Sequence, residues 1–156
     1  MSCRAVIFIL VWVSALGCNR SEKKPSSATD NGEATPKCFL YVEGRDSIKL
    51  SLVTASGEVH GRLAYLFFEK DKSMGTLDGL LRGDTLFATY RFTAEGTFSI
   101  RELAFLRKGD TYLMGTGEIL NEGNRDVFKD PHSISFDSGV ALKKISCDVM
   151  GDAIIR

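Results

Sequence analysis

Alternation of apolar and polar residues is the sequence feature that leaves this chain the fewest possible folds. It is clearest over residues 85–95, where Phe87 is the one apolar residue on the otherwise polar row. Residues 47–52 alternate in the same way. Side chains of a β-strand point alternately to its two faces, so this period predicts strands with one buried face. From Lys37 onward no stretch of about twelve residues has a convincing helical period, and we expect an all-β domain.

Short turn sequences separate the predicted strands. The turns combine Gly with Ser, Asp, Glu or Asn, residues that tolerate tight reversals: Ser56-Gly57, Arg82-Gly83-Asp84, Glu95-Gly96, Lys108-Gly109-Asp110 and Glu122-Gly123-Asn124, together with Asp71-Lys72-Ser73. Between them we predict about eight antiparallel strands. These are Phe39–Glu43, Ile48–Thr54, Val59–Glu69, Gly75–Leu81, Thr85–Ala94, Phe98–Arg107, Thr111–Leu120 and Leu142–Cys147.

An eight-stranded meander is most simply a closed or nearly closed barrel, because closure removes exposed strand edges. A flattened β-sandwich is the alternative architecture. A barrel of this size is filled by side chains or holds one small ligand. The bulky residues predicted to point inward, Tyr65, Phe67, Tyr90, Phe92 and Phe98, favour a packed interior. Four glycines, at 61, 79, 115 and 117, favour local space and leave a ligand-sized cavity as the second possibility.

The amino terminus predicts export. Arg4 precedes an apolar run over residues 5–17, which is about 20 Å long as a helix and too short for a bilayer core of about 30 Å. We therefore interpret residues 1–17 as a secretory signal peptide. The sequence Ser14-Ala15-Leu16-Gly17-Cys18 resembles the bacterial lipoprotein box, which implies cleavage after Gly17 and lipidation of Cys18. An ordinary secreted protein with a stray thiol at position 18 is the alternative.

Cysteine usage follows from this interpretation. Cys3 leaves with the signal peptide and Cys18 carries lipid, so Cys38 and Cys147 remain to pair in an oxidising compartment. We expect this disulfide to join the first strand to the last. Two reactive thiols are the alternative, but the sequence offers neither CxxC spacing nor a partnering base.

Residues 18–36 are predicted to form a lipidated cysteine and a flexible tether. Residues 19–36 have no aromatic residue, Leu, Ile or Val, and are rich in small and charged residues. As a flexible coil this segment spans roughly 20 to 25 Å. Asn19 after the lipidated position is similar to an outer-membrane sorting signal, and the basic residues that follow differ from acidic surface-export signals. We expect anchorage at the outer membrane, with the domain facing the periplasm.

Charge and motif content exclude several classes of function. The chain has 20 Lys+Arg and 20 Asp+Glu, so it lacks the excess of positive charge that nucleic-acid binding requires. The two histidines, His60 and His132, have no metal-ligand spacing to each other or to the cysteines, and we predict no metal and no cofactor. Hydrolase and nucleotide-binding motifs are missing from the sequence. We expect a protein without enzymatic activity.

Four residues are the candidate ligand contacts. Tyr65 and Tyr90 belong to predicted inward rows, and Arg101 and Glu102 follow on a later strand. Alternation places Glu102 on the row of Phe98, Ile100 and Ala104, where a buried carboxylate needs a partner. Two interpretations of Arg101 and Glu102 remain open: they form an internal hydrogen-bonded pair near a barrel mouth, or they contact a ligand.

A family resemblance rests on turn and strand motifs over most of residues 38–147. These are Tyr65, Glu69-Lys70-Asp71, Gly75-Thr76, Gly83-Asp84-Thr85-Leu86, Ala88, Tyr90, Phe92, Glu95-Gly96, Arg101-Glu102 and the run from Lys143 to Cys147. They resemble small uncharacterised lipoproteins of the Bacteroidota. The arrangement is also similar to lipocalin-like envelope barrels and to disulfide-clipped periplasmic lysozyme inhibitors, although the inhibitors' signature loops are missing.

Together these observations predict a lipid-anchored envelope protein whose barrel-like domain covers residues 37–149. The resemblance implies binding of a small apolar ligand or a protein partner. A surface-acting periplasmic inhibitor or envelope assembly protein is the alternative function.

Overall fold

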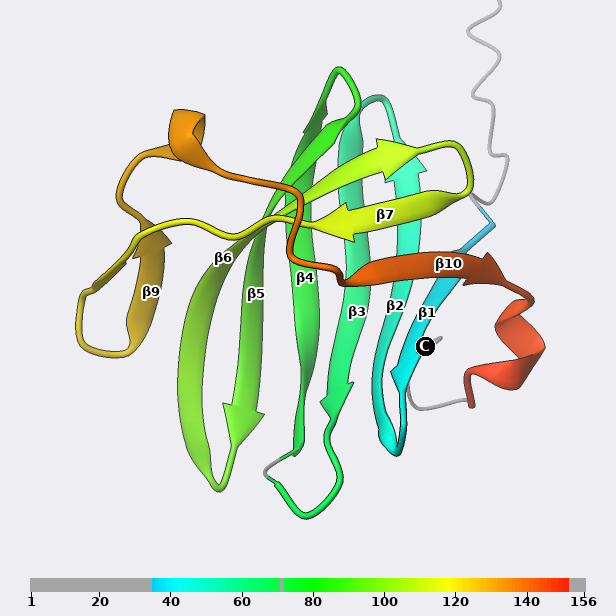
Figure 1. The fold of residues 1–156 in the computed structure, drawn as a ribbon, viewed down its shortest axis with the longest axis horizontal. Coiled ribbons are helices and arrows are strands. Elements are labelled where there is room, and N and C mark those ends of the chain that lie inside the picture. The colour runs from blue at the N-terminus through cyan, green and yellow to red at the C-terminus, as the bar shows by residue number, and fades with distance from the viewer. Residues whose placement is uncertain (1–34, 71, 152–156) are drawn as a thin grey trace, which may run out of the picture. The chain divides into compact units, whose positions relative to one another are not determined.

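The computed structural model describes residues 35–70 and 72–151, which fold mainly into β-strands (Figure 1). The predicted lipidation site, Cys18, and the tether up to residue 34 lie outside the described residues. The strands are β1 (Lys37–Glu43), β2 (Asp46–Ala55), β3 (Glu58–Leu66), β4 (Lys72–Arg82), β5 (Thr85–Ala94), β6 (Thr97–Lys108), β7 (Thr111–Met114), β8 (Ile119–Asn121), β9 (Arg125–Phe128) and β10 (Ala141–Ile145). Two short 3-10 helices, η1 (Pro131–Ser133) and η2 (Cys147–Val149), follow β9 and β10.

Eight of these strands form a closed antiparallel barrel. Strands β1 to β7 pair in chain order, and β10 pairs with both β7 and β1, which closes the ring. The register places residues with the same predicted face opposite one another: Leu50 of β2 lies between Phe39 of β1 and Leu63 of β3. The predicted closed barrel is confirmed, and the flattened sandwich is wrong.

The turns explain why consecutive strands pair so regularly. Ser56-Gly57 and Glu95-Gly96 are two-residue hairpin loops in which all four residues have a positive φ. This is the type I′ geometry, whose twist matches that of the flanking strands. Both were predicted as turns from the sequence.

Residues 115–140 leave the barrel and form an extension on its outside. The predicted strand Thr111–Leu120 is therefore wrong in its second half, because β7 ends at Met114 and β8 begins at Ile119. Strand β8 pairs with β9, and β9 runs parallel to the first half of β6 at Ile100 and Arg101. The extension thus covers part of β6 that β7 leaves unpaired.

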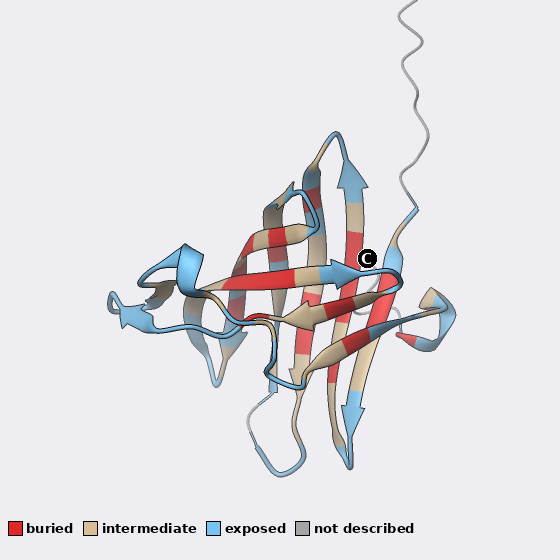
Figure 2. Ribbon diagram, turned by 45° about the horizontal axis from the view of Figure 1, so that its top comes forward, coloured by how far each residue is buried: buried red, intermediate tan, exposed pale blue. Residues whose placement is uncertain are grey.

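Side chains fill the barrel interior. The predicted inward row of β5 is confirmed, with Leu86, Ala88, Tyr90 and Phe92 all buried. Tyr90 and Phe105 have no exposed surface, and Leu50, Leu63, Leu77, Leu86 and Leu142 are equally buried. Figure 2 shows these buried segments at the middle of the strands, with exposed residues at the turns. The packed interior is confirmed for the centre of the barrel.

Strand β6 faces the opposite way from the prediction. Phe98 is 50% exposed and Glu102 points outward, whereas Leu103 and Phe105 belong to the core. Both rows of β6 are apolar because the outer row is covered as well: Ala104 is fully buried, and Ile134 and Phe136 from the extension approach it beside Gly115. Alternation alone therefore could not identify the inner face.

The four glycines predicted to leave space lie where neighbouring segments approach closely. A Cβ at Gly61 would overlap the backbone oxygen of Ser51, and one at Gly79 would overlap that of Phe87. A Cβ at Gly115 would meet Ile134 and Phe136, and one at Gly117 would meet Phe128. These positions allow neighbouring segments to approach closely. Gly79, Gly115 and Gly117 also border cavities, so local space is present beside them as expected, whereas Gly61 lines none of the cavities described below.

The disulfide between Cys38 and Cys147 is present, with the two Cα atoms 5.1 Å apart. It does not join two strands as predicted, because β10 ends at Ile145 and Cys147 lies in η2. The bond fastens this C-terminal turn to the outside of β1. There Met150, only 1% exposed, packs with Cys38 and Ala64 in a second, smaller apolar cluster. Strand β3 also ends earlier than predicted, at Leu66 instead of Glu69.

Candidate functional site

An open cavity of about 450 Å³ lies at one end of the barrel, and we call it the far mouth. The inward rows of β3, β5 and β7 end here, so aromatic and sulfur-containing side chains line it: Tyr65, Phe67, Phe92, Ala94 and Met114. Ser73 and Thr116 add hydroxyl groups at the edge. A mainly apolar cavity of this size with a few polar groups is typical of a site for one small molecule.

Arg101 supplies the positive charge of the far mouth. Its guanidinium lies 5.5 Å from the centre of the Phe92 ring, within the range of a cation–π contact. The Nε and Nη2 atoms donate to Oδ2 of Asp126 at 3.3 and 3.2 Å. Asn121 donates to the other oxygen of Asp126 at 2.8 Å, so the β8–β9 hairpin holds the carboxylate in place. Arg101 is thereby kept at the rim, over an aromatic wall.

Tyr65 and Tyr90 form the floor beneath Arg101. Tyr65 is partly buried and lines the cavity, whereas Tyr90 is fully buried below it, with the ring centres 5.9 Å apart. The Tyr90 hydroxyl donates to the backbone oxygen of Leu63 at 3.1 Å and lies 3.3 Å from Oγ of Ser73. Burial raises the pKa of both phenols above their ordinary value, so both are neutral at physiological pH.

Glu102 lies on the outer face of β6 and fastens the extension to the barrel. Its two oxygens accept hydrogen bonds from Nη2 of Arg125 at 3.1 Å and from the backbone N–H of Phe128 at 3.2 Å. The carboxylate is therefore paired, as expected, but outside the barrel and not within it. Of the four predicted residues, Tyr65, Arg101 and Glu102 line the far mouth, and Tyr90 supports it from below.

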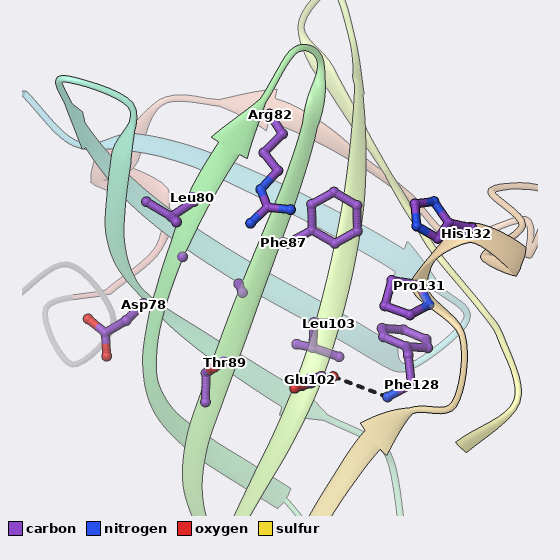
Figure 3. A pocket seen from close by; sticks show the side chains of 12 residues that line it. Asp78, Leu80, Arg82, Phe87, Thr89, Glu102, Leu103, Phe128, Pro131 and His132 are labelled. Carbon is purple, nitrogen blue, oxygen red and sulfur yellow. Dashed lines mark hydrogen bonds between the residues drawn. The ribbon is translucent and has the colours of Figure 1, made fainter. Parts of the chain in front are cut away.

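A second cavity, of about 610 Å³, lies on the outside of the barrel between β4, β5 and the extension. In Figure 3, Leu80 and Phe87 come from the strands, and Phe128, Pro131 and His132 come from the extension. The hydrogen bond from Phe128 to Glu102 lies between this outer groove and the far mouth, since both residues line both cavities. The groove was not predicted from the sequence. Phe87, the one apolar residue on the outer row of β5, could have indicated it, because an apolar side chain on that row implies a covering segment.

The described residues contain no group of three or more His, Cys, Asp or Glu side chains arranged to hold a metal ion. His60 points away from the core, as predicted, and Nδ1 of its ring lies 2.9 Å from Asp78. Asp78 also accepts a hydrogen bond from Arg91 at 2.6 Å, so its carboxylate is engaged on both oxygens. The cavities therefore offer binding surfaces built from aromatic rings, hydroxyls and single charges.

Comparisons with protein-family models, with curated proteins and with solved structures find no match to this chain. No helix within residues 35–70 and 72–151 is long and apolar enough to cross a membrane.

Proposed function

We propose that this protein is a lipid-anchored binding protein of the bacterial envelope, without enzymatic activity. Its far mouth binds a small amphipathic molecule that has an apolar body and an acidic group. The apolar body lies against Tyr65, Phe67 and Phe92, and the acidic group pairs with Arg101. The lipid on Cys18 and the tether keep the barrel at the membrane. The resemblance to envelope lipoproteins supports this anchorage.

The observation that carries the binding role is the contrast between the centre and the end of the barrel. The centre is filled by side chains with no exposed surface, whereas aromatic rings at the far mouth border open space. Tyr65 and Phe67 are only partly buried there, and a ligand that covers their remaining apolar surface gains about 25 cal/mol per Å². A guanidinium beside this surface favours a ligand with a negative group.

A fluorescent fatty acid such as a dansylated undecanoate tests the far mouth. We expect saturable binding to the barrel with its tether, and Arg101→Gln to weaken it about tenfold or more, because a charge-assisted hydrogen bond contributes about 1.5–3 kcal/mol. Arg91→Gln is the matched control. Arg91 and Arg101 side chains are each 45% exposed and each paired to an aspartate, but Arg91 lies on the outer face of β5. Equal losses in both variants, or no binding by the parent protein, would contradict the ligand site.

Replacement of Cys18 tests the anchor. We expect Cys18→Ser to remove the protein from the membrane fraction and to abolish metabolic labelling with a palmitate analogue, because no thioether forms on serine. Cys3→Ser, within the signal peptide, should leave both unchanged. A Cys18→Ser protein that still fractionates with membranes would rule out lipidation at this position.

A protein partner at the outer groove is the second candidate function, as for an inhibitor or an assembly factor. It is favoured by Leu80, which is 48% exposed, beside the partly buried Phe87 and Phe128. A partner held there would lose affinity on Phe87→Ser and keep it on Arg101→Gln, which separates the two functions.

A further inference from the structure

The end of the barrel opposite the far mouth is lined by basic residues. A cavity of about 630 Å³ opens there among Lys37, Arg107, Lys108 and Lys144, with only Asp84 and Asp110 of opposite charge; we call it the entry mouth. Arg107 pairs with Asp84 at 2.8 Å, and Lys144 pairs with Asp110 at 3.1 Å. Within the part of the chain that the structure describes, Lys37 and Lys108 form no ion pair and are exposed.

The turns at the other end carry no excess of positive charge. The β1–β2, β3–β4 and β5–β6 connections contain the acidic residues Glu43, Asp46, Glu69 and Glu95, against Arg45, Lys70 and Lys72. At the basic end the turns contain Glu58, Asp84 and Asp110 against Arg82 and Lys108, and Lys37, Arg107 and Lys144 at the strand ends make the balance positive there. The whole chain has no net charge. Such a charge distribution favours contact of this end of the barrel with a negatively charged surface.

The chain enters the barrel at this same basic end. Strand β1 begins at Lys37, and the turns between β2 and β3, β4 and β5, and β6 and β7 lie around it (Figure 1). Eighteen residues separate Cys18 from Lys37, and the tether expected from the sequence would span roughly 20 to 25 Å. A lipid on Cys18 thus keeps the entry mouth within reach of the bilayer surface.

We infer that the entry mouth docks onto an anionic phospholipid bilayer, with Lys37 and Lys108 as its principal contacts. The inference rests on the proposed lipid anchor for its biological setting, and it specifies the orientation of the barrel. Exposed Lys and Arg side chains near an anionic bilayer are attracted to its surface, and Lys37 and Lys108 supply two such charges at this mouth. With this end at the membrane, the far mouth points away from it and stays open to ligand.

Vesicle binding by the chain from Asn19 onward tests the surface without the anchor. Among the residues that the structure describes, the buried core runs from Cys38 to Met150, so removal of residues 1–18 leaves it intact. We expect it to sediment with vesicles that contain about one third phosphatidylglycerol and not with pure phosphatidylcholine, and binding to weaken with salt. Lys37→Gln/Lys108→Gln should reduce the partition coefficient about tenfold or more.

Lys70→Gln/Lys72→Gln is the matched control, because it removes the same charge from exposed positions at the opposite end. It should change partitioning less than about twofold, since charges beyond a Debye length of the surface are screened. Equal loss in both double variants, or no binding to anionic vesicles, would overturn the docking surface. Displacement by soluble glycerol phosphate at constant ionic strength would also overturn it, in favour of a small-anion site. None of these results depends on Cys18, so a failed anchor and a failed docking surface are distinguishable.

Discussion

Replacement of both barrel cysteines, Cys38→Ala/Cys147→Ala, should lower the free energy of unfolding by about 4 to 5 kcal/mol. The disulfide spans 109 residues. A cross-link of this length stabilises the folded state mainly because it lowers the conformational entropy of the unfolded chain. The native barrel loses little by comparison, because β1 and β10 remain paired through Cys38 opposite Ile145. The melting temperature should fall by about 15 to 20 °C.

Urea unfolding distinguishes this mechanism from local damage. Removal of the cross-link expands the unfolded state, so the urea dependence of the unfolding free energy should become steeper. Reduction of the parent protein under the same conditions should reproduce the variant's unfolding curve. A loss below about 1 kcal/mol with an unchanged slope would show that the bond contributes little beyond holding η2 in place.

The barrel could be predicted because most of its strands have only one buried face. In β5 the inner row is apolar and the outer row is polar apart from Phe87, so period, face and turns all agree. Hairpins at Ser56-Gly57 and Glu95-Gly96 then set the register between neighbours. Each of these signals is local in sequence, and an antiparallel meander needs no other information.

The errors cluster where the extension packs on the barrel. Strand β6 has two apolar rows because Leu103 faces the core and Ala104 faces the extension, so its period does not distinguish inside from outside. The contacts that would distinguish them come from residues 115–136, which return to β6 through a parallel pairing distant in sequence. For the same reason Glu102 was assigned to the wrong face.

The candidate site was predictable only in part. Tyr65 and Arg101 lie on separate strands, and closure of the barrel brings them to one mouth. The partner of Arg101, Asp126, comes from the β8–β9 hairpin, which no turn or period predicted as part of the site. The outer groove likewise depends on the position of η1, which is set by contacts and not by local pattern.

Truncation of Tyr90 should have the largest effect of any single change in the core. Tyr90→Ala removes a fully buried ring that stacks on Phe92 at 4.6 Å and contacts Tyr65, so we expect a loss of about 3 to 5 kcal/mol in unfolding free energy. Tyr90→Phe keeps the ring and removes only the hydroxyl, which bonds to Leu63 and Ser73, at a cost of about 0.5–1.5 kcal/mol. Urea unfolding measures both values.

Phe98→Ala is the control, and it tests which face of β6 points into the barrel. Both aromatic residues fell on rows predicted to point inward, but Phe98 is 50% exposed and lies opposite Thr93 on the outer face. Its truncation should cost less than about 1 kcal/mol, because surface substitutions remove little buried area. Similar losses for Tyr90→Ala and Phe98→Ala would mean that β6 has the opposite orientation. Arg101 would then point away from the lumen, and the far mouth would lose the cation on which its proposed selectivity for acidic ligands depends.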